Sequence, residues 1–125
     1  MNTLKVGIAS YDEMKALTFA IARGKRKLAP SEPRVWFPST ESFARVLSAG
    51  NRELLRTIAE KAPGSLEELA LLTGRKKPNL SRTLKTMANY GLVRFEIGPR
   101  RRMAPKVIYD RIELDLQLKS KDHAA

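Results

Sequence analysis

Basic and polar side chains between positions 75 and 102 are the part of this sequence best suited to chemistry. Arginine can bond guanine O6 and N7, and asparagine can bond adenine N6 and N7, at the edges of base pairs. Lysine and arginine also bind the phosphates of a nucleic-acid backbone. We expect base contacts from Asn79, Ser81, Arg82 and Lys85, phosphate contacts from Arg75, Lys76 and Lys77, and phosphate or minor-groove contacts from Arg100, Arg101 and Arg102.

The charge of the chain is concentrated in the same region. The 125 residues include 24 Lys and Arg against 13 Asp and Glu, which gives a formal net charge of +11. Residues 75–111 contain eleven of the basic residues and only two acidic ones, Glu96 and Asp110, an excess of nine. Isolated Lys and Arg are common on any solvated surface, but a concentration of this size favours a nucleic-acid partner.

Few residues suited to catalysis or metal binding are present. The chain has no cysteine, which excludes disulfides, thiolate zinc sites and thiol nucleophiles. Its one histidine, His123, lies among the last three residues, so one chain cannot assemble a histidine–carboxylate dyad. Glu67 and Glu68 are adjacent in a helix cap, and Glu113 and Asp115 share one strand face. We therefore expect no enzymatic activity, no catalytic residue, no metal site and no cofactor.

The overall composition is that of one water-soluble domain. Hydrophobic residues make up 42% of the chain, which is enough to form a core at this length. The N-terminus has no long apolar run of the kind that a signal peptide or a membrane helix requires. We expect a cytoplasmic protein with no membrane partner.

The helix predicted over residues 78–89 would carry the base-contact side chains. Pro78 suits its first turn, because the N–H that proline lacks would be unpaired there. Leu80, Leu84 and Met87 lie at positions i, i+4 and i+7 and are expected to face the core, which turns the basic and polar residues outward. Gly91 can adopt a positive φ and ends the segment.

Helical spacing also predicts the elements that precede this helix. One helical block starts at Ser39 or Thr40 and is interrupted at Gly50-Asn51, and the next ends at residues 63–64. Residues 65–68 match a capping box that opens a short helix, closed at residues 73–74. The expected inward residues are Phe43, Val46 and Leu47, then Leu54, Leu55 and Ile58, then Leu66, Leu69, Ala70 and Leu72.

Beyond Gly91 the apolar period changes from helical spacing to alternation. Residues 92–97 are predicted to form a strand, Gly98-Pro99 a turn, and residues 107–109 the returning strand. Arg100 to Arg102 then form the basic tip or descending edge of the hairpin. An alternative role for these arginines is to protect the hairpin edge from aggregation.

The two ends of the chain flank this region with further elements. Leu4, Val6 and Ile8 alternate as in a half-buried strand, and Ser10 opens a capping box for a helix over residues 11–23. Residues 111–118 alternate again and are predicted to form a last strand.

The stretch over residues 28–38 contains three prolines and little periodicity. We predict a linker or extended arm with Trp36 and Phe37 tucked against the core. Trp36 is interpreted as a core or interface anchor rather than a platform for stacking bases.

The predicted fold class is α+β. Residues 1–38 are assigned to an N-terminal strand, helix and proline-rich arm that contribute to dimerisation. Residues 39–118 form a DNA-binding domain with a C-terminal strand, and residues 119–125 a frayed tail.

From position 51 to 109 the predicted order is helix, short capped helix, glycine turn, longer helix and hairpin, which are the parts of a winged helix-turn-helix. The sequence here resembles the winged helix-turn-helix transcriptional regulators of the MarR and ArsR kind. The runs that carry this resemblance are Leu54-Leu55-Arg56-Thr57-Ile58, Ser65-Leu66-Glu67-Glu68-Leu69-Ala70, Leu80-Ser81-Arg82-Thr83-Leu84 and Tyr90-Gly91-Leu92-Val93.

A second resemblance covers most of the chain. The runs at residues 4–10, 36–39 and 109–114 are similar to those of short prokaryotic regulators that include TumA-type antitoxins of TumE toxins. This resemblance implies a homodimer that binds its own operator and docks a cognate toxin.

The leading hypothesis is therefore a homodimeric repressor that binds double-stranded DNA sequence-specifically, with a possible second role as an antitoxin that regulates its own operon. Two alternatives remain open, an RNA-binding or ribosome-associated protein and a pure protein-interaction module. For Arg82 and Lys85, the alternative is that they only form part of a solvated helix face. For Asn79 and Ser81, the alternative is that they only hydrogen-bond to the helix N-terminus. For the chain ends, the alternative to dimer contacts is that both termini extend one monomeric sheet.

Overall fold

The computed structural model of the protein describes residues 2–24 and 32–118; the tail at 119–125 and the first part of the proline-rich stretch lie outside these ranges. The described chain has the α+β fold class predicted from the sequence. Its helices are α1 (Tyr11–Ala22), α2 (Thr40–Val46), α3 (Ala49–Lys61), α4 (Leu66–Thr73), α5 (Lys77–Asn89) and the short 3₁₀ helix η1 (Pro99–Arg101). Its strands are β1 (Thr3–Ile8), β2 (Val35–Phe37), β3 (Arg94–Ile97), β4 (Met103–Lys106) and β5 (Arg111–Asp115).

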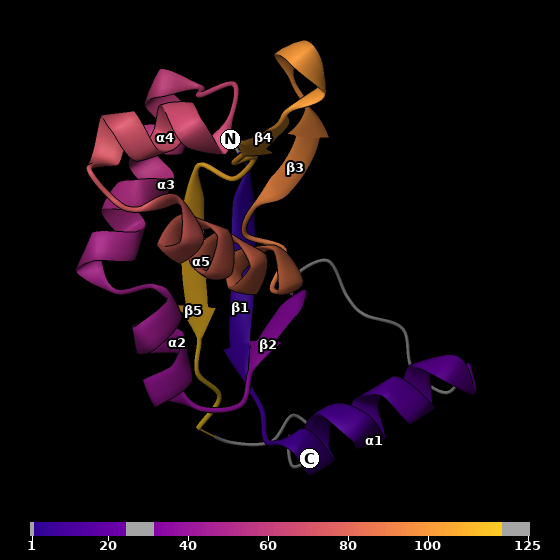
Figure 1. The fold of residues 1–125 in the computed structure, drawn as a ribbon. Coiled ribbons are helices and arrows are strands. Elements are labelled where there is room, and N and C mark those ends of the chain that lie inside the picture. The colour runs from indigo at the N-terminus through magenta and orange to yellow at the C-terminus, as the bar shows by residue number, and fades with distance from the viewer. Residues whose placement is uncertain (1, 25–31, 119–125) are drawn as a thin grey trace.

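The larger sheet has the parallel order β2-β1-β5, so strands from both ends of the chain pair within one molecule. Helix α5 crosses in front of this sheet, with α2, α3 and α4 beside it (Figure 1). Leu4 and Val6 of β1 are buried in the same core as Leu80, Leu84 and Met87 of α5. The sheet is therefore the support against which α5 is held.

Strand β2 corrects the prediction of a linker or arm over the whole of residues 28–38. Val35 to Phe37 pair with Val6 to Ile8 of β1. Three residues are too few to show a period, and the nearby prolines are typical of loops, so only the pairing with β1 reveals this strand. The expected packing of Phe37 is confirmed: its ring is fully buried, stacks on Tyr90 with centroids 4.0 Å apart, and meets Phe43 edge-on at 5.4 Å.

Trp36 packs against the backbone of β1 at Gly7. A Cβ atom on Gly7 would lie 2.4 Å from a carbon of the Trp36 ring, closer than any non-bonded contact allows. Glycine is thus required here by the close approach of the indole. This contact agrees with the interpretation of Trp36 as a core anchor.

The boundary between α2 and α3 lies earlier than the predicted break at Gly50-Asn51. Helix α2 ends before Leu47, and Ser48 caps α3 by accepting a hydrogen bond of 3.2 Å from the Asn51 N–H. Serine is a strong N-cap, and a glycine in the first helical turn interrupts few hydrogen bonds. Gly50 and Asn51 therefore begin a helix instead of ending one.

The smaller sheet is the antiparallel hairpin of β3 and β4. Its returning strand is Met103–Lys106, with Ile97 opposite Met103 and Phe95 opposite Pro105, so the predicted strand over residues 107–109 is wrong. Pro105 hides β4 in the sequence, because proline is admitted in sheets only at edges, where its missing N–H breaks no ladder bond. The hairpin projects beyond the body of the protein (Figure 1).

The N-terminal helix α1 has the predicted start and a much looser packing than the other helices. Ser10 and Glu13 form the reciprocal capping box, with both hydrogen bonds at 3.2 Å. No residue of α1 is buried, and Phe19 and Ile21 are exposed. Figure 1 shows α1 apart from the sheet and the other helices. Helix α1 therefore exposes apolar side chains to solvent instead of burying them in the core.

Two further observations concern the length of the last strand and the character of the helices. The last strand is shorter than predicted, because β5 stops at Asp115 and does not reach residue 118. Among the described residues, no helix is both long and apolar enough to cross a membrane.

Candidate nucleic-acid interface

Helix α5 has one buried and one exposed face, as its apolar spacing predicts. Leu80, Leu84 and Met87 are fully buried. Asn79, Arg82 and Lys85 are exposed and Ser81 is half-buried, and the sequence of α5 contains no acidic residue. The helix therefore presents hydrogen-bond donors and positive charge to the outside.

The start of α5 has no side-chain cap. Lys76 occupies the N-cap position and has no side-chain oxygen to accept from the first turn, where Pro78 is the second residue. Free N–H groups at a helix N-terminus attract anions such as phosphate. The Lys76 side chain is exposed and makes no hydrogen bond or ion pair to another described residue. This turn fits the phosphate contact expected of Lys76.

Arg75 is tied to the start of α3. Its guanidinium donates to Asn51 Oδ1 at 3.1 Å and to the Gly50 carbonyl at 2.9 Å, and the residue is half-buried. Arg75 therefore joins the turn before α5 to α3 through bonds that the sequence spacing does not reveal. The partners Gly50 and Asn51 are residues whose role the sequence analysis missed.

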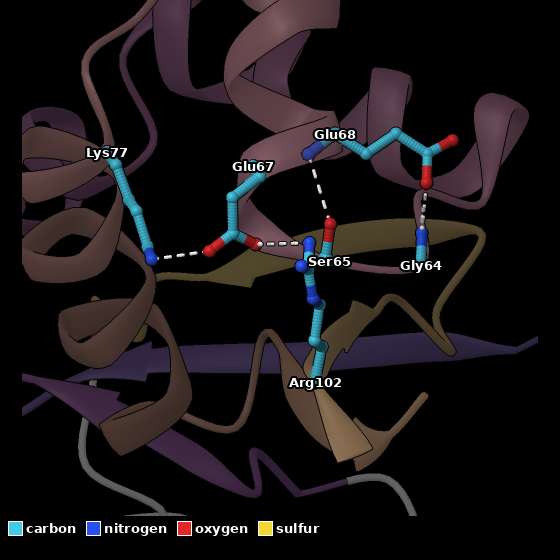
Figure 2. Close-up of polar contacts among 6 residues, drawn as sticks. All are labelled: Gly64, Ser65, Glu67, Glu68, Lys77 and Arg102. Atoms are coloured by element: carbon cyan, nitrogen blue, oxygen red, sulfur yellow. Dashed lines mark hydrogen bonds and ion pairs between the residues drawn. The ribbon is translucent and has the colours of Figure 1, made fainter. Parts of the chain in front are cut away.

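The start of α4 differs in detail from the predicted capping box. Ser65 Oγ accepts from the Glu68 N–H at 3.1 Å, but the Glu68 carboxylate accepts from the Gly64 N–H at 2.7 Å and not from the Ser65 N–H (Figure 2). The Glu68 carboxylate thus binds the backbone N–H one residue before the one that a capping box would use. Leu69 is fully buried, whereas Leu72, expected on the inner face, is 45% exposed. With Leu69 in the core and Ser65 at the N-cap, Glu67 lies in the first turn of α4.

Glu67 joins the start of α5 to the turn at the tip of the hairpin. Its Oε1 accepts a hydrogen bond of 2.5 Å from Lys77 Nζ, and its Oε2 lies 3.7 Å from a guanidinium nitrogen of Arg102 (Figure 2). The hydrogen bond from Lys77, followed by that from the Glu67 N–H and the charges of Lys77 and Arg102, lowers the pKa of Glu67 from 4.5 to about 2. Sequence analysis assigned Glu67 to a cap alone, and no local spacing points to its contact with Arg102.

This pKa predicts how stability depends on pH. The folded protein holds the Glu67 carboxyl with a pKa below its ordinary value of 4.5, so the contact stabilises the fold fully above that pH. Stability is then lost as the pH falls from about 4.5 to about 2. In urea unfolding at a series of pH values, the stability difference between the wild type and Glu67→Gln is expected to shrink across this window. A Glu67 carboxyl that titrates near 4.5 in side-chain NMR contradicts the contact.

The hairpin tip carries the remaining predicted site residues. Arg100 and Arg101 both have a φ of 59°, in the left-handed region that non-glycine residues rarely adopt. The Gly98 N–H closes the turn on the Arg102 carbonyl at 2.6 Å. Beside the tip, Ile97 is 76% exposed. The tip therefore displays three arginines and an apolar residue on a tightly turned backbone.

The predicted site residues thus form two surfaces. Arg75, Lys76, Lys77 and the outer face of α5 are contiguous along one turn and one helix. The Glu67 carboxylate lies between Lys77 at the start of that helix and Arg102 in the hairpin turn. The part of the chain that the structure describes has no group of three or more His, Cys, Asp or Glu residues placed to hold a metal ion.

Comparison with known proteins identifies one family. Residues 46–114, which include α3, α4, α5, the hairpin and most of β5, match the model of the HVO_A0114 family. The search of the curated proteins found no match, and neither did the search of the solved structures. Because the matched residues make up more than half of its length, the chain belongs to the HVO_A0114 family.

Proposed function

We propose that the protein is a transcriptional regulator that binds double-stranded DNA sequence-specifically through a winged helix-turn-helix. In this assignment α3, α4 and α5 are the three helices, α5 is the recognition helix, and the β3–β4 hairpin is the wing. The observation that carries the proposal is the outer face of α5, which displays Asn79, Arg82 and Lys85 beside a turn rich in basic residues.

The dimensions and chemistry of α5 suit a DNA groove. A helix with its side chains is about 10–12 Å across, and the major groove of B-DNA is about 12 Å wide. Arg82 is exposed and has no ion pair within the described chain, so its guanidinium is available for guanine O6 and N7. Asn79 is placed one turn earlier and suits adenine, whereas Ser81 is more recessed.

Phosphate contacts come from the two ends of this surface. Lys76 lies at the free N-terminus of α5, where N–H groups and positive charge coincide. Arg100 and Arg101 on the wing reach phosphates or the adjacent minor groove, whose narrow form attracts arginine. These contacts supply affinity, and the face of α5 supplies specificity.

A homodimer completes the proposal. One winged helix-turn-helix covers a single half-site, and a two-fold dimer reads two half-sites about 34 Å apart. The exposed Phe19 and Ile21 of α1 and the exposed Leu114 and Leu116 suit an interface between copies. Occupancy of the operator by such a dimer represses transcription. The narrower role as an antitoxin that also docks a cognate toxin rests on the resemblance to the TumA type.

Selection from a random pool tests the proposal. The protein is incubated with random-sequence duplexes, and bound molecules are amplified over successive rounds. We expect convergence on one motif, which structured RNA at the same salt concentration does not displace. Efficient displacement by RNA, or a pool that never converges, supports the RNA-binding or protein-interaction alternative instead.

Replacement of Lys76 tests the phosphate contacts separately. Lys76→Ala is expected to weaken binding to the selected motif and to random duplexes alike, because a phosphate contact carries no sequence information. The slope of log K against log salt should become shallower by about 0.9, the contribution of one phosphate. The measurement is a titration by fluorescence anisotropy at several salt concentrations. An unchanged slope contradicts the placement of Lys76 on the DNA backbone.

A further inference from the structure

The contact between Glu67 and two cations has a consequence for how DNA binds, provided that the proposed function holds. Lys77 begins α5, Arg102 precedes β4, and Glu67 lies in the first turn of α4. The three side chains are each about half exposed, with fractions of 54%, 50% and 45%. Two cations, one from α5 and one from the hairpin turn, thus meet at one carboxylate of α4 on the solvent-accessible surface (Figure 2).

The carboxylate lies where a phosphate would meet these two cations, bonded to Lys77 and 3.7 Å from the Arg102 guanidinium. Lysine and arginine form charge-assisted hydrogen bonds with carboxylates and phosphates in the same way. The Lys77 ammonium is bonded to Oε1 and the Arg102 guanidinium faces Oε2. Neither cation can turn fully toward DNA without loosening its hold on Glu67.

Other carboxylates near these elements do not share this position. Glu68 accepts from the Gly64 N–H, and Glu96 pairs with Arg94 on its own strand at 2.7 Å. Lys76, next to Lys77, has no carboxylate partner among the described residues. Glu67 therefore acts on two particular cations and leaves their basic neighbours free.

We propose that Glu67 stands in for a DNA phosphate between Lys77 and Arg102 and so weakens the binding of duplex DNA. On random DNA, where α5 gains no base contacts, the two cations remain with Glu67 and contribute little to binding. On the cognate motif, base contacts hold α5 in the groove, and phosphates replace the carboxylate at the expense of its contact with both cations. Affinity for both kinds of DNA is lower as a result.

The test compares Glu67→Gln with the wild type on a random-sequence duplex. Glutamine keeps the size of the side chain and removes its charge, which releases both cations. We expect Glu67→Gln to bind this duplex about three- to tenfold more tightly near 0.1 M salt, with a salt slope steeper by about 0.9–1.8, because one or two more phosphates are neutralised. Affinity for the selected motif should rise at least as much, because phosphates must displace the carboxylate there in the wild type.

Glu41→Gln is the matched control. Glu41 is an exposed carboxylate in the first turn of α2, as Glu67 is in that of α4, and Figure 1 places α2 and α4 at opposite ends of the body. The Glu41→Gln substitution removes the same charge from the start of a helix, so a general effect of net charge would appear in both variants. We expect Glu41→Gln to change affinity by less than about twofold, since distant charges are screened.

Two more variants separate the proposed role from a structural one. Glu67→Asp keeps the negative charge in the first turn of α4, which protects the fold should the glutamine variant melt early, but its shorter side chain cannot reach both cations. It is expected to bind random DNA with intermediate affinity. Lys77→Met added to Glu67→Gln should remove much of the gain.

The outcomes distinguish this inference from the proposed function. If the wild type shows no salt-dependent binding to any duplex, the proposed function fails and the inference falls with it. If the wild type binds but Glu67→Gln matches Glu41→Gln, or binds more weakly, only the role of Glu67 is overturned. The role of Glu67 is also overturned if Glu67→Gln still binds more tightly after Lys77→Met and Arg102→Met are both added. The gain in affinity then does not depend on these cations.

Discussion

Arg82→Ala is expected to weaken binding to the selected motif by about 1–3 kcal/mol and to relax the base preference at one position. The reason is the placement of Arg82 on the exposed face of α5, opposite the buried Leu84 side of the helix, with no ion pair inside the described chain. When this guanidinium is removed, the complex loses a bidentate contact to one base pair.

The measurement is an affinity titration against the motif and against duplexes with each base pair replaced in turn. Arg45→Ala, which removes an exposed arginine from α2, is the control for the loss of one positive charge. The variant at position 82 should no longer distinguish bases at the contacted pair, whereas the control keeps the full preference. Equal behaviour of the two variants contradicts the assignment of α5 as the recognition helix.

Leu84→Ala is expected to lower the free energy of unfolding by about 2–5 kcal/mol. Leu84 is fully buried in the core that joins α5 to the larger sheet, so truncation leaves a cavity between them. The same cavity loosens the support of the recognition helix. We therefore expect DNA binding to be lost at temperatures where the wild type still binds.

Urea unfolding followed by circular dichroism measures this effect. Leu71→Ala is the matched control, because Leu71 is 86% exposed on α4 and its truncation should change stability by less than about 0.5 kcal/mol. A small loss at position 84, comparable to that at position 71, contradicts the packing of α5 against the sheet.

Much of the helical part of the fold was predictable, because its signals are local. The buried positions of α5 lie at i, i+4 and i+7, and serines mark the starts of α1, α2 and α4. Gly74 and Gly91 have the positive φ values expected of residues that end helices. Such patterns depend on neighbours within one or two turns, which the sequence displays directly.

The strands were harder to predict, because their partners are remote. Three-residue β2 exists through pairing with β1, some 30 residues earlier, and Pro105 disguises β4. The break between α2 and α3 was predicted too late in the chain, because glycine is typical of helix ends, whereas Ser48 is the residue that caps α3. In each case a pairing or capping interaction determined the structure against the conformational preference of a local residue.

The candidate site divides in the same way. The outward direction of Asn79, Arg82 and Lys85 follows from the apolar spacing of a single helix. The bonds of Arg75 to Gly50 and Asn51, and the contact of Glu67 with Arg102, connect residues far apart in the sequence. No spacing rule predicts them, since they depend on how α3, α4 and the hairpin pack together.

The proposed role of α5 in DNA binding is tested most directly by an NMR titration of the labelled protein with a duplex containing the selected motif. We expect the largest shifts at Asn79, Arg82 and Lys85, with smaller ones at Lys76 and at the wing arginines. Contacts between Arg82 and a guanine in the major groove should appear in the spectra of the complex. Shifts confined to other surfaces, such as α1 or β5, with the outer face of α5 unchanged, would contradict this role.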